Sequence, residues 1–319
     1  MNNEEEYLIP IFLINGQLDS GKTSFIKEII EGGQFDEAQN KLLITCEEGE
    51  EEYTPEFLAK HGFDHASISH DELTAEKLEE LDEKYDPWLI VIEYNGMWAP
   101  ADLGMLPKPH GWTVYQVITI MDASSFQVQW KNMQAIMAET VKTCESVIFN
   151  RCNLDMDLGS FRRSMKALNP AVDVIFEDEN GEIISGVNEI LPYDLNTEGV
   201  IDVEDEDFGI WFIDARERMD IYTGKTFKFR VQVLKNSKMK KNEFAATRRA
   251  MTCCADDIVN IGFITEFDGT PELSDKDWVM LTARFSTVSH PAYNGQTGPV
   301  LEAVSVEPAD PPAEEVVSF

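Results

Sequence analysis

The sequence is poor in basic residues. It has 26 Lys and Arg against 59 Asp and Glu, so the formal net charge over 319 residues is −33. Most of such a surface repels nucleic acid and anionic membranes, and neither is expected as a partner. An excess of acidic residues is typical of a solvated surface. The alternative interpretation is a surface that attracts cations or a basic partner. One basic cluster, interpreted as a solvated loop in a predicted hairpin, comprises Lys235, Lys238, Lys240, Lys241, Arg248 and Arg249.

The sequence also lacks long apolar runs and a disulfide framework. Its longest apolar stretches have the length of a strand, so no transmembrane segment is expected. Residues 1–6 have neither the basic start nor the apolar core of a signal peptide. The few thiols are expected to be reduced, which indicates a cytoplasmic location. The cysteines are Cys46, Cys144, Cys152, Cys253 and Cys254.

The length favours two domains, and a hydrophobic content of 43% is enough for a core in each. In residues 1–195 short apolar runs alternate with helical patterns, which predicts an α/β domain with a mostly parallel sheet. Strands are predicted at 8–15, 41–46, 88–93, 114–121, 146–150 and 172–176. Helices are predicted at 21–31, 55–61, 71–84, 125–142 and 158–168.

The pattern changes after residue 195. Residues 196–207 are rich in acids and are interpreted as a linker. Residues 208–305 then alternate polar and apolar side chains, as in 226–233, with further strand-like pieces at 244–251, 258–264 and 278–285. Several strands in about 100 residues predict a small β-barrel of the OB type or a sandwich. The tail, 306–319, is rich in Pro and Glu and is expected to be disordered.

A complete phosphate-binding loop, G-x-x-x-x-G-K-[ST], follows the apolar run 8–14. In such a loop backbone N–H groups surround the β-phosphate, Lys22 reaches the β and γ oxygens, and the Thr23 hydroxyl binds Mg²⁺. The buried strand before it and the helical pattern after it favour this interpretation over a chance Gly-rich turn. The predicted nucleotide contacts here are Gly16, Gln17, Leu18, Asp19, Ser20, Gly21, Lys22, Thr23 and Ser24.

A P-loop enzyme also needs a carboxylate at the end of a neighbouring strand. The run 86–96 supplies one, because Glu93 closes a buried strand and Gly96 lets the backbone turn near the phosphates. Glu93 would hold Mg²⁺ or its water, unless it is merely an acid in solvent.

A switch segment is expected after the strand 41–46. Glu47 and Glu50 lie there and could hold the metal shell or an attacking water. However, residues 47–52 contain five acids in six positions, a pattern that is equally typical of a solvated face.

Taken in order, these motifs give residues 8–195 a resemblance to the CobW family of P-loop GTPases, relatives of the metallochaperones for nickel and cobalt enzymes. The matching pieces are the P-loop, Glu47-Glu48-Gly49-Glu50, Ile92-Glu93-Tyr94-Asn95-Gly96, Val117 to Ala123 and Leu168-Asn169-Pro170. The resemblance implies GTP, or another NTP, and Mg²⁺ as ligands. It also implies that Lys22 neutralises the γ-phosphate, that Glu93 holds the metal's water shell, and that Glu47 or Glu50 places the attacking water.

The chain departs from the family in its metal motif. Family members usually carry Cys-x-Cys-Cys between the switch segment and the strand ending in Glu-x-x-Gly, whereas residues 53–85 contain no cysteine. Five other side chains in this stretch could bind a metal, although scattered exposed histidines are the blander interpretation: His61, Asp64, His65, His70 and Asp71.

The motif that selects the base also differs. The family's Asn-Lys-x-Asp is replaced by Asn150-Arg151-Cys152-Asn153. Arg151 can still stack on a base. The amide of Asn153, however, puts a donor opposite a guanine donor, which costs about 1–3 kcal/mol when both are buried. Guanine specificity is therefore open, unless Asp155 or the linker supplies the missing acceptor.

The C-terminal part has a second resemblance, carried by residues 219–233, the run Arg248 to Asp257 with its Thr-Cys-Cys-Ala-Asp, Trp278-Val279 and Gly298-Pro299-Val300. These resemble the C-terminal domain of the YcgQ-like family, which accompanies a membrane permease and is associated with CobW-type GTPases in zinc limitation. Adjacent cysteines on a strand face opposite sides, so Cys253 and Cys254 share an ion only if the backbone turns there. They are either Zn²⁺ or redox residues, with Asp256 and Asp257 nearby, or buried small hydrophobes.

Two functions follow. The first is a GTP-type hydrolase that couples NTP turnover to the handling of a transition metal for a metalloprotein client. Zinc is the expected metal. The second is a catalytically weak P-loop module that contacts a permease or another protein through its β-domain. Assembly into a homo-oligomer is compatible with either.

Overall fold

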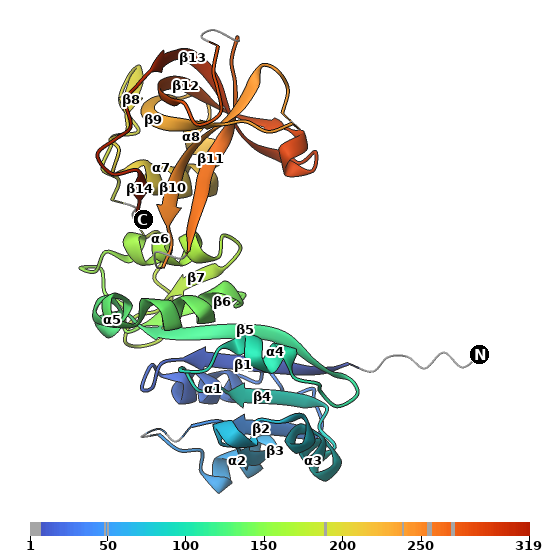
Figure 1. Cartoon of the computed structure of the whole chain (residues 1–319). Coiled ribbons are helices and arrows are strands. Elements are labelled where there is room, and N and C mark those ends of the chain that lie inside the picture. Colours follow the sequence, from blue (N-terminus) through green and yellow to red (C-terminus); the bar gives the residue numbers. More distant parts are fainter. Residues whose placement is uncertain are drawn as a thin grey trace. The chain divides into compact units, whose positions relative to one another are not determined.

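The computed structural model describes residues 8–47, 49, 51–187, 190–237, 239–253, 257–268 and 272–319. The chain divides into two compact units (Figure 1). The first comprises Met1–Leu158 with Leu168–Val187, and the second comprises Gly159–Ala167 with Asn188–Phe319. The second unit thus begins before residue 195, where the sequence places the end of the first domain.

The first unit is built on seven parallel strands in the order β3-β2-β4-β1-β5-β6-β7. Their bounds are β1 Ile9–Gly16, β2 Lys41–Thr45, β3 Phe63–Ser67, β4 Leu89–Glu93, β5 Trp112–Asp122, β6 Ser146–Asn150 and β7 Asp173–Phe176. The strands β2 and β4 are buried at every residue, and their apolar runs Leu42–Ile44 and Leu89–Ile92 lie between two helical layers. The predicted α/β P-loop fold is confirmed.

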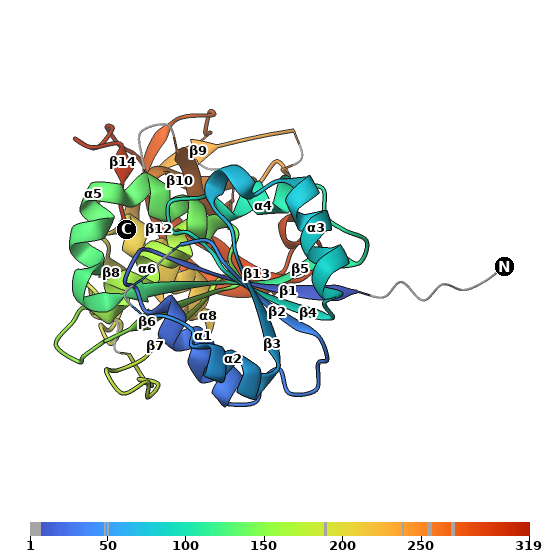
Figure 2. The ribbon, with the colours of Figure 1, turned by 90° about the horizontal axis from the view of Figure 1, so that it is seen from below.

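Helices cover both faces of this sheet. In Figure 2, α1 and α2 lie on one face and α3, α4 and α5 on the other. The helices are α1 Lys22–Glu31, α2 Pro55–His61, η1 His70–Glu72, α3 Ala75–Tyr85, α4 Pro100–Met105, α5 Ala123–Lys142 and α6 Leu158–Leu168, most of which belongs to the second unit. Ile26 and Ile30 of α1 pack into a core with Ile14 and Val91 of the sheet. Neither β3 nor α4 is among the elements predicted from the sequence.

The second unit contains a mixed sheet of seven strands in the order β14-β10-β11-β13-β12-β9-β8. The strands are β8 Val200–Asp202, β9 Thr226–Leu234, β10 Glu243–Met251, β11 Ile258–Glu266, β12 Trp278–Ser289, β13 Thr297–Pro308 and β14 Val316–Val317. The short helices are α7 Phe208–Glu217, α8 Met219–Tyr222 and η2 Pro291–Tyr293. Alternate residues of β9, from Phe227 to Val233, are buried, which confirms the predicted period of two.

An additional pairing closes five of these strands into a ring. β10 pairs with β11 on one side and with β9 on the other, while β13 and β12 join β11 to β9. The β11–β13 pair is parallel and the other four pairs are antiparallel. A closed five-stranded ring is the connectivity of an OB-like barrel. Trp211 of α7 packs against Phe229 in its core, with ring centroids 4.5 Å apart.

Two segments differ from their prediction. The interval 196–207, predicted as a linker, contains β8, which pairs in parallel with β9. The tail 306–319, predicted as disordered, contains β14, which pairs with Arg249 and Ala250 of β10. Acids dominate 196–207, and prolines and acids dominate the tail, so the few buried apolar residues that anchor them, Ile201, Val203 and Val317, give no sequence signal.

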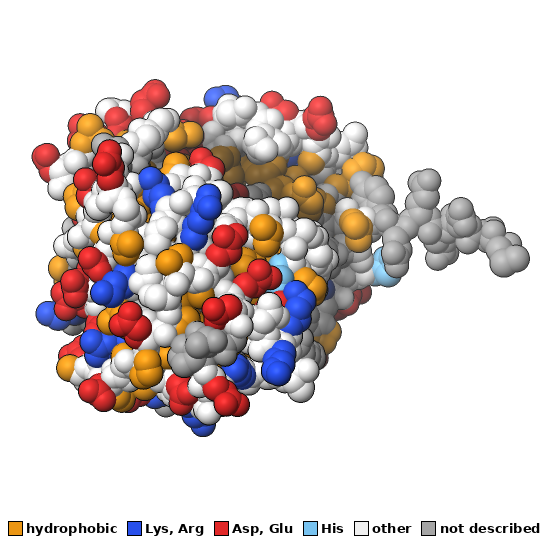
Figure 3. Space-filling model, turned by 90° about the horizontal axis from the view of Figure 1, so that it is seen from above, with side chains coloured by type: hydrophobic (Ala, Val, Ile, Leu, Met, Phe, Trp, Pro, Cys, Tyr) orange, Lys and Arg blue, Asp and Glu red, His pale blue; other side chains and the backbone are white. Residues whose placement is uncertain are grey.

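The predicted basic loop also needs correction. Arg248 lies on β10 and is buried, and its guanidinium donates to Oδ1 of Asp205 at 2.9 Å and to the carbonyl oxygen of Glu314 at 2.8 Å. Arg248 therefore links the acidic segment 196–207 and the tail 306–319 to strand β10 of the barrel. Lys238 lies outside the described residues. On the face seen in Figure 3, acidic side chains are scattered between basic ones, as on a solvated surface.

Candidate nucleotide-binding site

The P-loop joins β1 to α1, as the sequence predicts. Gly16 ends β1, and Gly21, with φ 96°, directly precedes the first residue of α1. The left-handed backbone at Gly21 suits glycine, and a Cβ atom at Gly16 would collide with the carbonyl oxygen of Ile120. A loop that ends at a helix N-terminus presents backbone N–H groups to an anion.

Lys22 is held inside this loop. Its side chain is 3% exposed, and Nζ donates to the carbonyl oxygens of Gly16 at 2.8 Å and Gln17 at 3.0 Å. The ammonium also forms an ion pair with the carboxylate of Glu47, directly after β2. Glu47 therefore lies in the site rather than on a solvated face, and phosphate oxygens that reach Lys22 would compete with it. Glu50 lies outside the described residues.

Glu93 converges on the same loop from β4. Since β1 and β4 are parallel neighbours, with Ile14 opposite Glu93, their carboxyl ends meet at one edge of the sheet. The Thr23 hydroxyl donates to Oε1 of Glu93 at 2.8 Å, and the Tyr53 hydroxyl donates to Oε2. A hydroxyl and a carboxylate at this distance are the hard oxygen ligands that Mg²⁺ takes beside phosphate and water, so these residues fit that ion.

The protonation of Glu93 reflects its burial. The side chain is 5% exposed, and burial raises the pKa of its carboxyl above the ordinary value, although hydrogen bonds from Tyr53 and Thr23 and the charge of Lys22 act in the opposite direction. Burial and the neighbouring Glu93 also raise the pKa of Tyr53, which therefore remains a hydrogen-bond donor.

Gly96 lies against the P-loop. Its carbonyl oxygen accepts a 3.1 Å hydrogen bond from the side-chain amide of Gln17, and a Cβ atom at this position would collide with the carbonyl oxygen of Gly16. The turn after β4 thus needs glycine for close approach, as the sequence analysis expects.

Glu51 and Tyr53 are two site residues that the sequence reasoning did not select. Oε2 of Glu51 accepts from Ser24 at 2.6 Å, and Oε1 pairs with Lys27 at 2.7 Å. These two hydrogen bonds, led by that of Lys27, lower the pKa of Glu51. In the sequence, Glu51 is indicated only by its place in the acidic run 47–52. No motif in the neighbouring sequence indicates a role for Tyr53.

The segment predicted to select the base touches the other side of the P-loop. Nδ2 of Asn150, at the end of β6, donates to the carbonyl oxygen of Ser20 at 2.7 Å. The Arg151 guanidinium donates to the carbonyl oxygen of Asp19 at 3.2 Å and pairs with Asp122 at 2.6 Å. Asn153 does not join them; its Oδ1 accepts from the backbone N–H of Asp155 at 3.0 Å.

Two adjoining hollows meet at Arg151. A cleft of about 210 Å³ is lined by Lys22, Thr23, Glu47, Glu93 and Arg151, among others. A larger depression of about 720 Å³ is lined by Arg151, Asn153 and Glu179, among others. The arrangement suits a nucleotide with its phosphates in the cleft and its base in the depression, where the Glu179 carboxylate is a further acceptor near the position of Asn153.

The histidines of the first unit do not assemble. His65 hydrogen-bonds to Thr45, with 3.0 Å between Nε2 and Oγ1, and His70 packs edge-on against Trp98. Across the described ranges, neither these histidines nor His61 belongs to a group of three metal-ligating side chains.

The cysteines divide into two kinds. Cys46, Cys144 and Cys152 are buried, and burial raises the pKa of each thiol to about 12, as for small core residues. Cys253 is half-buried, and its thiol donates to Asp257 at 3.1 Å. Cys254 and Asp256 lie outside the described residues, so the shared ion of Cys253 and Cys254 stays a prediction.

The strand, loop and helix that carry Lys22 and Thr23, with the Glu93 carboxylate beside them, define a P-loop nucleotide-binding protein. The family model "CobW/HypB/UreG, nucleotide-binding domain" matches residues 10–176, and the chain belongs to this family. The model "DUF1980 C-terminal domain" matches residues 186–317. Both resemblances of the sequence analysis are confirmed.

Two solved structures illustrate what this chain is similar to. The hydrogenase maturation factor HypB from Archaeoglobus fulgidus is 19% identical over 55% of this chain and 84% of that chain, with a TM-score of 0.41. The Zn(II)-bound YjiA GTPase from E. coli is 14% identical over 88% of this chain and 95% of that chain, with a TM-score of 0.40. These likenesses are weak, and the family assignment stands on the family model alone.

A comparison with curated proteins gives no match. Among the described residues, no helix is both long enough and apolar enough to span a bilayer.

Proposed function

We propose that this protein is a cytoplasmic, GTP-type nucleotide hydrolase that couples NTP turnover to the handling of a transition metal, zinc in the first place. The observation that carries the proposal is the convergence of Lys22, Thr23 and Glu93 on one cleft. Three side chains from β4 and the start of α1 supply the cation and the two oxygen ligands that phosphoryl transfer requires.

Each residue has a role that its contacts suggest. The loop N–H groups and Lys22 hold the phosphates, and Thr23 and Glu93 hold Mg²⁺ and its water shell. Held there, Mg²⁺ would supply positive charge against the negative charge that develops on the transferred phosphoryl group. Glu47, beside Lys22, places the attacking water, and Tyr53 keeps the Glu93 carboxylate oriented toward Thr23.

Phosphate release tests the hydrolase. Glu93→Gln keeps the size of the side chain but removes its charge, so it should lower the rate by about 100-fold or more. Glu31→Gln, at the exposed end of α1, is the matched control and should hydrolyse at the wild-type rate. A wild-type rate that Glu93→Gln leaves unchanged would contradict the proposed roles.

A second candidate function is favoured by Asn153 and by the absence of cysteine in residues 53–85. In this second function, the P-loop unit binds the nucleotide but hydrolyses it slowly or not at all. Nucleotide binding then regulates a contact between the barrel and a permease or another protein. A robust phosphate release that Glu93→Gln abolishes would argue against this candidate.

The metal part of the proposal is separable from the nucleotide part. Zinc is the proposed metal and a metalloprotein the proposed client, with Cys253 and Cys254 as the sequence-based ligands. Equilibrium dialysis with Zn²⁺ should show that a Cys253→Ser/Cys254→Ser variant binds one Zn²⁺ fewer per chain than the wild type. Unchanged stoichiometry in that variant would remove the cysteine site.

A further inference from the structure

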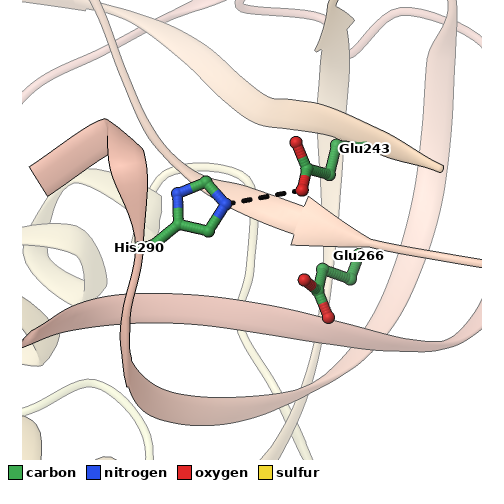
Figure 4. Close-up of side chains that lie close together, drawn as sticks. All are labelled: Glu243, Glu266 and His290. Carbon is green, nitrogen blue, oxygen red and sulfur yellow. Dashed lines mark hydrogen bonds and ion pairs between the residues drawn. The ribbon is translucent and has the colours of Figure 1, made fainter. Parts of the chain in front are cut away.

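Three side chains with metal-ligating atoms meet at one end of the barrel. Glu243 begins β10 and Glu266 ends β11, where the two are direct partners in the antiparallel register. His290 follows β12. One ligand atom from each residue lies within 4.8 Å of the other two, and all three side chains point toward a common space (Figure 4).

The cluster places two acids side by side, and two of its three side chains are buried. Glu243 is 3% and His290 is 7% exposed, while Glu266 is half-buried. Two like charges directly opposite each other on neighbouring strands repel, and a buried carboxylate needs a charged or hydrogen-bonding partner.

Lys240 supplies only part of the missing charge. Its ammonium lies 2.6 Å from Oε1 of Glu243, but its side chain is 60% exposed and so can leave at little cost. Within the ranges that the structure describes, the Glu266 carboxylate has no hydrogen bond or ion pair. Glu243 also accepts a 3.0 Å hydrogen bond from the backbone N–H of Lys240 and faces Nε2 of His290 at 3.4 Å, so Glu266 is the carboxylate whose charge needs a cation.

We propose that Glu243, Glu266 and His290 bind one divalent transition-metal ion of the zinc class. One imidazole nitrogen and two carboxylate oxygens are a donor set that zinc accepts, and three protein ligands leave a position open for exchange. The exposed edge of Glu266 is the entry path. The site deepens the metal-handling part of the proposed function, and its residues all lie in the second unit, apart from the nucleotide residues.

The His290 ring gives the site a specific signature. Nδ1 accepts a 3.1 Å hydrogen bond from the backbone N–H of Ala292, so the ring proton is on Nε2, which faces Glu243 at 3.4 Å. A metal ion on Nε2 requires the proton on Nδ1 instead, and the bond from Ala292 is then lost. Metal binding is thus coupled to a change of tautomer.

Zn²⁺ dialysis of the full chain without nucleotide tests the site. In a Cys253→Ser/Cys254→Ser background, Glu266→Gln and His290→Gln should each weaken binding by about tenfold or more. Glu307→Gln, exposed on β13, is the matched control and should bind as the background does. Lys240→Met should bind Zn²⁺ several-fold more tightly, because the competing ammonium is gone. Circular dichroism melting establishes that each variant is folded.

Equal Zn²⁺ affinity and stoichiometry in Glu266→Gln, His290→Gln and the background would overturn the proposal. A nitrogen spectrum of the labelled histidine rings, of which the chain has only 5, adds a readout that a purely structural role would not move. The His290 Nδ1 signal should change from an unprotonated to a protonated nitrogen on addition of Zn²⁺, and an unchanged tautomer would also overturn it. Lys22→Ala should leave Zn²⁺ binding intact, so failure of the nucleotide site and failure of this site are distinguishable.

Discussion

The Thr23 hydroxyl donates a 2.8 Å hydrogen bond to Oε1 of Glu93, across 70 positions of the chain. The first residue is in the opening turn of α1 and the second ends β4, which is the parallel neighbour of β1. This contact joins the P-loop to a second strand end, and it places a hydroxyl and a carboxylate where one Mg²⁺ would take both.

Glu93 should reduce the stability of the fold at neutral pH. Because burial raises its pKa, the folded chain holds the proton more tightly than the unfolded chain does, and stability is lost as pH rises through the unfolded and then the folded pKa. Glu93→Gln should therefore raise the free energy of unfolding at pH 7 by about 0.5–1 kcal/mol, and the difference should vanish near pH 4. Urea denaturation at several pH values measures it. A variant less stable than wild type at pH 7 would contradict this prediction.

Glu47 should compete with phosphate for Lys22. The two side chains form an ion pair in a nearly enclosed position, so a nucleotide must displace the carboxylate. Glu47→Gln should bind a nucleoside diphosphate about fivefold more tightly, which corresponds to about 1 kcal/mol. Glu31→Gln, at the exposed end of α1, is the matched control and should bind as the wild type does. Fluorescent-nucleotide titration would refute the prediction if Glu47→Gln bound no more tightly than wild type.

Asn153 should weaken the preference for guanine. Its amide donor would face the 2-amino donor of guanine but could donate to the 2-carbonyl oxygen of xanthine, so XTP should compete at least as well as GTP in the wild-type chain. Asn153→Asp should shift the ratio toward GTP by about tenfold or more, in line with about 1–3 kcal/mol for a repaired buried pair. Competition among GTP, ATP and XTP tests this prediction. A strong GTP preference in the wild-type chain would show that another acceptor selects the base, and Glu179, which lines the same depression as Asn153, is one candidate.

The first unit could be predicted well because its signals are local. β1, β4 and β6 are short apolar runs, and the loop from Gly16 to Thr23 carries its own motif. β3 was missed because Phe63–Ser67 is an edge strand with three polar or charged side chains among five residues, so neither apolar continuity nor clear alternation marks it.

The contacts that depend on tertiary packing could not be predicted. Tyr53 reaches Glu93 across 40 positions with no motif around it. β8 and β14 are strands only because the barrel offers them edges in β9 and β10. Likewise, Glu243 and Glu266 face each other only through the register of their hairpin, and His290 lies 47 positions from Glu243.

The most direct test of the account is calorimetric titration of Mg²⁺-GTP into the wild-type chain and into Lys22→Ala. Lys27→Ala, which removes an ammonium that pairs with Glu51 instead, is the control. We predict saturable binding to the wild-type chain and to Lys27→Ala, and its loss in Lys22→Ala. Absence of Mg²⁺-nucleotide binding in the wild-type chain, or equal binding in Lys22→Ala, would contradict the central claim that Gly16 to Thr23 forms a working phosphate site.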